Sequence, residues 1–484
     1  MVSKNNSLLA PDPLRWCVIS SEQVRCNGHR LDASAYDIEA MNALSVVRHS
    51  PYGWVYLWGK YGLVEDAYYP GRYKRIYTSE EEGEPFFLPS QLEEIYPKPT
   101  KWISAKTANL LKNDRIVDGC LLLSRSGTIG KSSISSRATI GKIFSDDVIR
   151  VFFKDIYDLG YVYAYLNTGT GLKLLQSNNY GAVVDHIEPE HLAKVPIPNA
   201  PEEIKRRIHE AIVASYDLRD QSNDLIDEAQ HLLYEALDLP ENPDLKPKYY
   251  APDAGFRCFS MSSNELNGRF DASYHLPEIK EIYSLISKQA AEVTTLGDPR
   301  ISKKIKVGNR FKRVYVNKGD GAVYLNGKAI GQLDPNGLEK KYLSLKIHAQ
   351  QIREQLILKE NMLLITCSGT LGKVVLVPKH WDGWIGTHDL IRVFAPDTMS
   401  GYIYSYLSSS IGQKLLMRSA YGAVVDHIEP SHVTEVAIPL LKDKSLQSHI
   451  NDLVLEANGL RYEAYLKEQD ALSQMEKVLY SQKQ

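Results

Sequence analysis

The chain has 484 residues, of which 43% are hydrophobic, and 57 Lys and Arg against 59 Asp and Glu leave a net charge of −2. This length predicts two to four domains. The near-neutral charge argues against a globally basic nucleic-acid-binding protein, so any polyanion site must be a local patch or be completed by a partner. Five scattered cysteines without a C-x-x-C pair, no apolar run of membrane-helix length and no signal peptide lead us to expect a cytoplasmic protein with reduced thiols and no metal site.

The first elements in chain order form a plan that later recurs. Residues 120–127, CLLLSRSG, predict a strand that ends in a glycine turn, and residues 148–153, VIRVFF, predict a second strand. Apolar residues at helical spacing predict a tyrosine-rich helix over 161–177. The phrase YGAVVDHIEP follows at 180–189, and its Pro189 suits the first turn of a short helix.

A long helix and a linker come next. Eight of ten positions in a 4-3-4-3 pattern are apolar, and these positions are 204, 208, 211, 215, 218, 222, 225, 229, 232 and 236. The proline-rich segment 239–255 then ends the helix and predicts a linker.

After the linker the same elements return in the same order. The phrase YGAVVDHIEP recurs unchanged at 421–430, 241 positions after its first occurrence. Further pairs lie 238 to 242 positions apart: RLDASAY at 30–36 with RFDASYH at 269–275, RYKRIY at 72–77 with RFKRVY at 310–315, SGTIGK at 126–131 with SGTLGK at 368–373, DDVIRVF at 146–152 with THDLIRVF at 387–394, and VPIP at 195–198 with VAIP at 436–439. The chain is therefore a tandem duplication with a period of about 240 residues, which predicts two domains and not a solenoid.

The second copy also ends in a long helix with a matching pattern. Eight of its ten positions are apolar, at 446, 450, 453, 457, 460, 464, 467, 471, 474 and 478. Two matched seams can bury each other as an antiparallel intramolecular coiled coil, although two amphipathic helices that lie on their own domains would give the same periodicity. We expect a mixed α/β protein with a globular domain at each end of a two-helix strut and a pseudo-two-fold axis. The predicted divisions are a domain at 1–200, a helix at 201–240, a linker at 241–255, a domain at 256–440 and a helix at 441–484.

These duplicated motifs resemble the specificity (S) subunit of a Type I restriction-modification system, and the resemblance covers essentially the whole chain. Each copy carries an Arg-Leu/Phe-Asp-Ala start, a Ser-Gly-Thr-x-Gly-Lys turn, an Ile-Pro exit and the helix that follows. The start and exit residues are Arg30, Asp32, Ile197, Pro198, Arg269, Asp271, Ile438 and Pro439.

The resemblance implies two target-recognition domains and no catalysis by this chain. Each domain would read one half of an interrupted, asymmetric sequence in double-stranded DNA, as expected for two readers on a spacer of fixed length. It implies as partners two DNA adenine methyltransferase subunits and restriction (translocase) subunits, and no membrane. S-adenosylmethionine, ATP and magnesium would belong to those partners, and no cofactor is expected in this chain.

Residues that both copies share cannot be the main base readers if the two domains read different sequences. They are instead candidates for phosphate contacts, which supply most of the affinity. The segment 300–313, RISKKIKVGNRFKR, has seven Lys or Arg and no acid, although a solvated strand face is the simpler interpretation. The basic candidates are Arg72, Lys74, Arg75, Lys303, Lys304, Lys306, Arg310, Lys312 and Arg313.

The Ser-Gly-Thr-x-Gly-Lys turns can present backbone N–H groups to a phosphate, or they can be simple tight hairpins. They are not Walker A loops, because Arg125 and Cys367 stand where that loop needs its first glycine. Their candidate DNA contacts are Ser126, Thr128, Lys131, Ser368, Thr370 and Lys373. Base readers are expected where the copies diverge, at 46–70, 78–106, 132–145, 316–350 and 374–388.

The repeated phrase contains an adjacent acid and base. Catalysis by them would need a nucleophile or a metal, and none is visible in the sequence. We expect a structural role or a face that docks the same partner twice. The residues concerned are Tyr180, Asp185, His186, Tyr421, Asp426 and His427.

Three other interpretations stay open. The residues Pro252-Asp253 and Glu278-Ile279-Lys280 fit a PD-(D/E)xK nuclease pattern, but the pattern falls across the linker and has no counterpart in the first copy. The chain could serve a methylation-based phage-defence system that is not Type I. It could also be a protein scaffold that binds no DNA.

Overall fold

The computed structural model describes residues 18–26, 29, 31, 36–177, 186–239, 258–266, 268–422 and 426–481. The predicted linker 241–255 and the Pro252-Asp253 pair lie outside the described residues, as do Arg30, Asp32, Tyr180 and Asp185. Among the described residues, no helix combines the length and the hydropathy needed to span a bilayer.

Three small sheets make up the first copy. An antiparallel pair joins β1 (Trp54–Tyr56) to β10 (Pro196–Pro198). Two four-stranded sheets have the orders β2-β9-β6-β7 and β3-β5-β4-β8. Their strands are β2 (Val64–Tyr68), β3 (Tyr77–Thr78), β4 (Gly83–Phe87), β5 (Lys101–Ser104), β6 (Leu121–Ser124), β7 (Ser132–Ile134), β8 (Ile143–Phe144) and β9 (Val148–Phe153).

The second copy repeats these sheets strand for strand. Its orders are β11-β20, β12-β19-β16-β17 and β13-β15-β14-β18. Even the parallel pair at one sheet edge recurs, as β4 with β8 and as β14 with β18. The strands are β11 (Glu292–Thr295), β12 (Lys304–Lys306), β13 (Tyr315–Val316), β14 (Gly321–Leu325), β15 (Tyr342–Ser344), β16 (Leu363–Thr366), β17 (Val374–Leu376), β18 (Ile385–Gly386), β19 (Leu390–Phe394) and β20 (Ala437–Leu440). The strands predicted at 120–127 and 148–153 are confirmed as β6 and β9.

The tyrosine-rich segment is two helices in each copy, so the prediction of one continuous helix was wrong. Thr168 and Ser409 stand at the breaks, and each side-chain oxygen accepts a hydrogen bond from a backbone N–H of the second helix, Gly171 or Gly412, at 3.1 Å. Such an N-cap favours a new helix start over continuation. The shorter helices are α1 (Ser21–Cys26), α2 (Ile38–Arg48), α3 (Ala105–Leu110), α4 (Ile156–Leu166), α5 (Gly169–Gln176), α7 (Pro277–Gln289), α8 (Ala349–Gln351), α9 (Asp397–Ser408), α10 (Ser410–Met417) and α11 (Pro430–Thr434).

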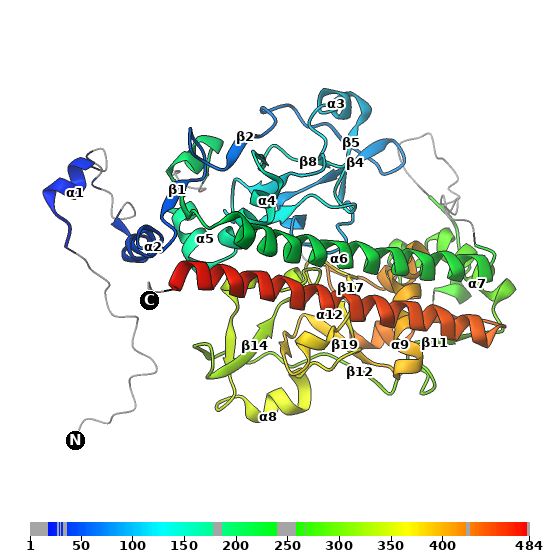
Figure 1. Ribbon diagram of the computed structural model, residues 1–484. Coiled ribbons are helices and arrows are strands. Elements are labelled where there is room, and N and C mark those ends of the chain that lie inside the picture. The colour runs from blue at the N-terminus through cyan, green and yellow to red at the C-terminus, as the bar shows by residue number, and fades with distance from the viewer. Residues whose placement is uncertain are drawn as a thin grey trace, which may run out of the picture.

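The two long helices α6 (Glu202–Ala236) and α12 (Lys444–Tyr480) lie side by side and antiparallel through the middle of the molecule (Figure 1). The first copy packs on one side of this pair and the second copy on the other. Residues 242 positions apart take equivalent places in the two helices, so the pair has the expected pseudo-two-fold relation. The coiled coil predicted from the sequence is therefore present.

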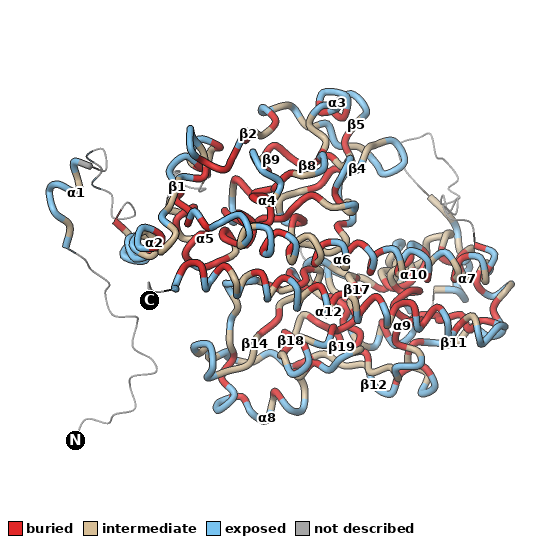
Figure 2. Tube along the Cα trace, viewed as in Figure 1, coloured by how far each residue is buried: buried red, intermediate tan, exposed pale blue. Residues whose placement is uncertain are grey.

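The buried positions differ in part from the predicted seam. In α6 the buried residues include Ile208, Ile212, Ser215, Arg219, Ser222, Ile226, Ala229 and Leu233, so positions 212, 219, 226 and 233 are buried in place of the predicted 211, 218, 225 and 232. In α12 they include Ile450, Leu453, Val454, Ala457, Arg461, Ala464, Glu468, Ala471, Met475 and Val478, so the predicted Leu453 is buried, whereas 461, 468 and 475 are buried in place of 460, 467 and 474. The sequence pattern favoured Leu225 and Leu232, which pack against the core of the second copy. Residues of both helices also belong to the cores of the two copies, so the helices are buried against the domains as well as against each other. Figure 2 shows buried and exposed residues alternating along α6 and α12.

Each copy builds its core on both long helices. The core of the first copy includes Ile208 and Ile212 of α6 together with Ala471 and Met475 of α12. The core of the second copy includes the opposite ends of the same helices, with Leu233 of α6 among its members. Because each core uses both helices, neither copy is independent of the pair.

The two copies also touch each other on the pseudo-two-fold axis, which corrects the expectation of domains held apart by a strut. Glu94 and Gln332 are equivalent residues, 238 positions apart, and they form an antiparallel β-bridge. Beside it the N–H of Ile95 donates to the carbonyl of Gly331 at 2.9 Å. The hydroxyl of Tyr96 donates to the Asp227 carboxylate of α6 at 2.7 Å, which fixes the segment 93–96 to the helix.

Candidate nucleic-acid interface

The Ser-Gly-Thr-x-Gly-Lys segments are tight hairpin connections, from β6 to β7 and from β16 to β17. Gly127 and Gly369 both have φ of 75°, and Gly130 and Gly372 have φ of 92° and 73°. This left-handed region strains residues with a Cβ, which explains the two glycines in each copy. Thr128 and Thr370 are exposed at the tips of these turns.

The repeated phrase lies against this turn in both copies, so two motifs that were separate in sequence form one site. Ser126 and His186 form an antiparallel β-bridge, as do Ser368 and His427. The next residue of the phrase, Ile187 or Ile428, donates its N–H to residue 125 or 367 at 3.0 and 3.2 Å. Ile187 and Ile428 are buried.

The phrase continues into a short helix in each copy, at Pro189–Lys194 and at α11, as the prolines predicted. Asp426 is exposed, and the hydroxyl of Tyr421 donates to the Glu429 carboxylate at 2.5 Å. The described part of the phrase is thus held by contacts within its own domain, which fits the structural role. Its role in partner docking stays a prediction.

The lysines that end the two turns lie at the contact between the copies. The ammonium group of Lys131 forms an ion pair with Glu93, and that of Lys373 forms one with Glu94 at 2.6 Å. Both lysine side chains are 26% exposed. Each would therefore have to exchange a carboxylate for a phosphate before it could bind DNA.

The basic segment of the first copy is partly neutralised. Arg75 forms ion pairs with Asp146 and, at 3.5 Å, with Asp147. Burial acts to lower the pKa of Arg75, but the hydrogen bonds to Asp146 and Tyr77 and the charge of Asp146 together outweigh it and raise that pKa. Arg72 and Lys74 are exposed and have no ion pair within the described residues.

The equivalent segment of the second copy has a different partner. Arg313 donates from Nη2 to Nδ1 of His388 at 2.9 Å, and His388 stands where the first copy has Asp146. Burial lowers the pKa of His388, opposed by Asp389 and reinforced by Arg313 and Arg310, so the ring is neutral at pH 7. Among the described residues, no carboxylate forms an ion pair with Arg313 as Asp146 does with Arg75.

Four other basic candidates of the second copy lie at 303–304 and at 310–312. Arg310 and Lys312 are exposed, as are Lys303 and Lys304, and the structure describes no ion pair for these four side chains. Lys306 is half-buried and donates to the carbonyl of Glu354. Burial, reinforced by Lys304, lowers the pKa of Lys306. Besides Arg313, six of the nine basic candidates are thus exposed and have no ion pair among the described residues, and these are Arg72, Lys74, Lys303, Lys304, Arg310 and Lys312.

A buried arginine in each copy escaped the sequence reasoning. Arg150 and Arg392 are equivalent residues of β9 and β19, at 1% and 0% exposure. Arg150 donates to carbonyls that include Phe144 of β8 at 3.0 Å, and Arg392 to carbonyls that include Leu390 at 2.9 Å and Gly386 of β18. Each therefore ties its two four-stranded sheets together, although burial lowers its pKa. The sequence does indicate this role, because both copies place an arginine inside an otherwise apolar strand.

Among the described residues, no group of three or more His, Cys, Asp or Glu side chains could hold a metal ion. In the nuclease-like pattern, Glu278 and Lys280 lie on α7, where Lys280 pairs with Glu265 at 2.9 Å. Glu278 pairs with Lys414 at 3.5 Å.

No protein-family model matches the chain, and no curated protein matches its sequence. Solved structures do match it. One is a Type I restriction-modification S subunit from M. genitalium, with 14% identity, 86% of this chain and 92% of that chain covered, and a TM-score of 0.32. Another is an HsdS subunit from Thermoanaerobacter tengcongensis, with 12% identity, 88% and 99% covered, and a TM-score of 0.27. A third, from work on assembly and conformational transition of the type I R-M system, has 11% identity, 87% and 99% covered, and a TM-score of 0.27. The first two are subunits of the kind that the sequence resembles.

Proposed function

We propose that the chain is the DNA-recognition subunit of a Type I restriction-modification complex, in which each copy reads one half of a bipartite site. The observation that carries the proposal is the repetition of one fold, strand for strand, on the two sides of an antiparallel helix pair. Two related readers on a rigid spacer suit two half-sites at a fixed separation, with unread bases between them. The sequence motifs that each copy shares with S subunits support the same function.

The phosphate contacts of this proposal are the exposed, unpaired cations. In the first copy these are Arg72 and Lys74, and in the second copy Arg310 and Lys312 are their equivalents. Lys303 and Lys304, at the start of β12, add two more cations to the second group. Arg75 supports binding less, because Asp146 and Asp147 already neutralise it.

The partners follow from the same proposal. Two adenine methyltransferase subunits and the restriction subunits would assemble on this chain in the cytoplasm of a prokaryote, and they would supply S-adenosylmethionine, ATP and magnesium. The duplication would give two equivalent surfaces for two copies of one partner.

The experiment is a base-resolution map of adenine methylation in cells that express the neighbouring methyltransferase with and without this chain. A two-part motif with a fixed gap should appear only with the chain, and replacing one copy should change one half of the motif. Methylation that does not depend on the chain would contradict the proposal.

A second arm tests the phosphate contacts on the assembled complex. Arg310→Gln with Lys312→Gln should lower the slope of log binding constant against log salt by about 2, since each phosphate contact contributes roughly 0.9. The control is Lys288→Gln with Lys467→Gln, two exposed lysines on α7 and α12. Equal slopes for both double variants would remove this segment from the interface.

A further inference from the structure

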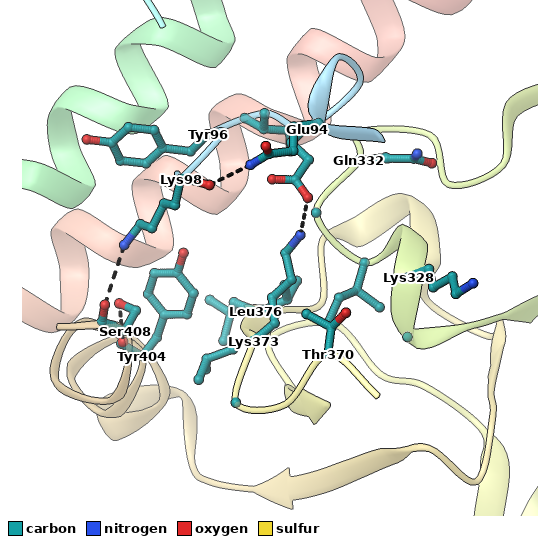
Figure 3. A pocket seen from close by; sticks show the side chains of 18 of the residues that line it. Glu94, Tyr96, Lys98, Lys328, Gln332, Thr370, Lys373, Leu376, Tyr404 and Ser408 are labelled. Carbon is teal, nitrogen blue, oxygen red and sulfur yellow. Dashed lines mark hydrogen bonds and ion pairs between the residues drawn. The ribbon is translucent and has the colours of Figure 1, made fainter. Parts of the chain in front are cut away.

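A cavity of about 620 Å³ lies where the two copies and the helix pair meet. Its walls come from residues 90–100 of the first copy, from 327–333 and 370–378 of the second copy, and from both long helices. Figure 3 shows Lys98 and Tyr404 on one side of it, with Lys373 reaching across to Glu94. The volume falls within the roughly 300–1,000 Å³ that is usual for small-molecule sites.

The internal duplication identifies an unbalanced charge in this cavity. Arg219 and Arg461 are equivalent residues of α6 and α12, 242 positions apart. Arg219 is buried and forms an ion pair with the buried Glu468 at 2.9 Å. The equivalent of Glu468 in the other helix is Ile226, so Arg461 meets an isoleucine where its twin meets a carboxylate.

Arg461 and Ile226 both line the cavity. Arg461 is 8% exposed, and its Nε donates to the hydroxyl of Ser222 at 3.3 Å. No carboxylate of the described residues lies within ion-pair distance of its guanidinium. Burying a charge without a counter-charge is strongly unfavourable, so an anion beside Arg461 would be stabilised.

The other charged side chains of the wall are mostly basic. The cavity is lined by four basic side chains, Lys98, Lys328, Lys373 and Arg461, and by one acidic side chain, Glu94. Glu94 is already paired with Lys373. The rest of the wall includes the aromatic side chains of Tyr96, Tyr404 and Trp381.

We propose that this cavity binds a small organic anion of the nucleotide class. The phosphate lies against Arg461, and the base lies against the aromatic part of the wall. The ligand bridges both copies and the helix pair, and so it stiffens their arrangement. The proposal does not rest on the proposed DNA-recognition function.

The test is calorimetric titration of the full chain with adenosine monophosphate, adenosine and inorganic phosphate. Adenosine monophosphate should bind, and each of the other two should bind at least tenfold more weakly. Arg461→Gln should weaken adenosine monophosphate binding at least tenfold. Arg207→Gln, an exposed arginine of the same helix pair, is the matched control and should leave it unchanged.

A second variant keeps the test decisive if Arg461→Gln folds poorly. Ile226→Glu gives Arg461 the carboxylate that its twin already has, so the ligand-free chain should keep or raise its melting temperature and lose nucleotide binding. The proposal is overturned if adenosine monophosphate does not bind, or if Arg461→Gln and Ile226→Glu bind it like the unaltered chain. Equal binding of inorganic phosphate would overturn the nucleotide class.

Discussion

His380 illustrates how a single buried side chain couples the second copy to the helix pair. Its ring stacks on Tyr465 of α12 with 4.1 Å between ring centroids, and its Nε2–H donates to the carbonyl of Leu333 at 2.8 Å. Nδ1 is buried and has no hydrogen-bond partner in the part of the chain that the structure describes. Burial lowers the pKa of His380 to about 4 against its usual 6.5, opposed by the hydrogen bond to Leu333 and reinforced by nearby Lys340.

This depressed pKa predicts how stability depends on pH. Above pH 6.5 the ring is neutral in both states, so its contribution is complete. Between pH 6.5 and 4 the unfolded chain takes up the proton first, so the free energy of unfolding falls as pH falls, by about 3 kcal/mol in total. Urea unfolding of the chain and of His380→Phe at pH 7, 5.5 and 4 measures this difference. Parallel pH profiles for the two proteins would show that His380 does not titrate as a buried group.

At the scale of the element, the seam of the coiled coil contains one asymmetric ion pair. Arg219 of α6 bonds Glu468 of α12, and the hydroxyl of Tyr163 donates to the same carboxylate. Burial opposes the charge on Arg219, but the charge of Glu468 raises the pKa of Arg219, so the guanidinium stays charged. Because the equivalent pair is Arg461 with Ile226, this contact distinguishes the two helices from each other.

Removing Glu468 alone should destabilise the fold much more than replacing Arg219, Glu468 and Tyr163 together. Glu468→Leu leaves Arg219 buried without a counter-charge, so the free energy of unfolding should fall by about 3–5 kcal/mol. Replacing the set by Arg219→Met, Glu468→Leu and Tyr163→Phe should be close to neutral or stabilising. Urea denaturation of both variants measures this, with Arg461→Met as the control that breaks no ion pair. A triple variant as unstable as the single one would contradict the argument.

The element scale also shows where sequence reasoning reached its limit. The helices α6 and α12 and the strands β6 and β9 could be predicted, because their periodicity and their turn residues are local properties. The seam could not be placed correctly, since apolar residues such as Leu225 face a domain while Arg219 faces the partner helix. Periodicity records that a side chain is buried, and it does not record which neighbour buries it.

At the scale of the whole molecule, the two copies are joined by a contact that the duplication did not reveal. Glu93 and Glu94 of the first copy reach lysines of both turns, Lys131 of their own copy and Lys373 of the other. The equivalent positions in the second copy are Gly331 and Gln332, so the acids come from one side only. The contact is therefore asymmetric although it lies on the pseudo-two-fold axis.

Removing these acids should loosen the arrangement of the copies without unfolding either. Glu93→Ala with Glu94→Ala removes the ion pairs of Lys131 and Lys373 at the contact between the copies, so this contact weakens and separation of the copies is favoured. Small-angle X-ray scattering at low salt should report a larger radius of gyration, while circular dichroism stays unchanged. Glu80→Ala, at an exposed position, is the control. An unchanged scattering profile would mean that the helix pair alone fixes the domains.

The sequence by itself determined the duplication, the paired long helices, the main strands and the candidate turns, because these depend on repeated residues, local periodicity and glycine at positive φ. Only the tertiary structure decided that the phrase and the turn form one site, that Lys131 and Lys373 are ion-paired, and that Arg461 faces a cavity while Arg219 is neutralised. The physical reason is that charge pairing and burial depend on distances between residues far apart in the chain. Equivalent residues of the two copies therefore acquire different partners once the copies fold against one another.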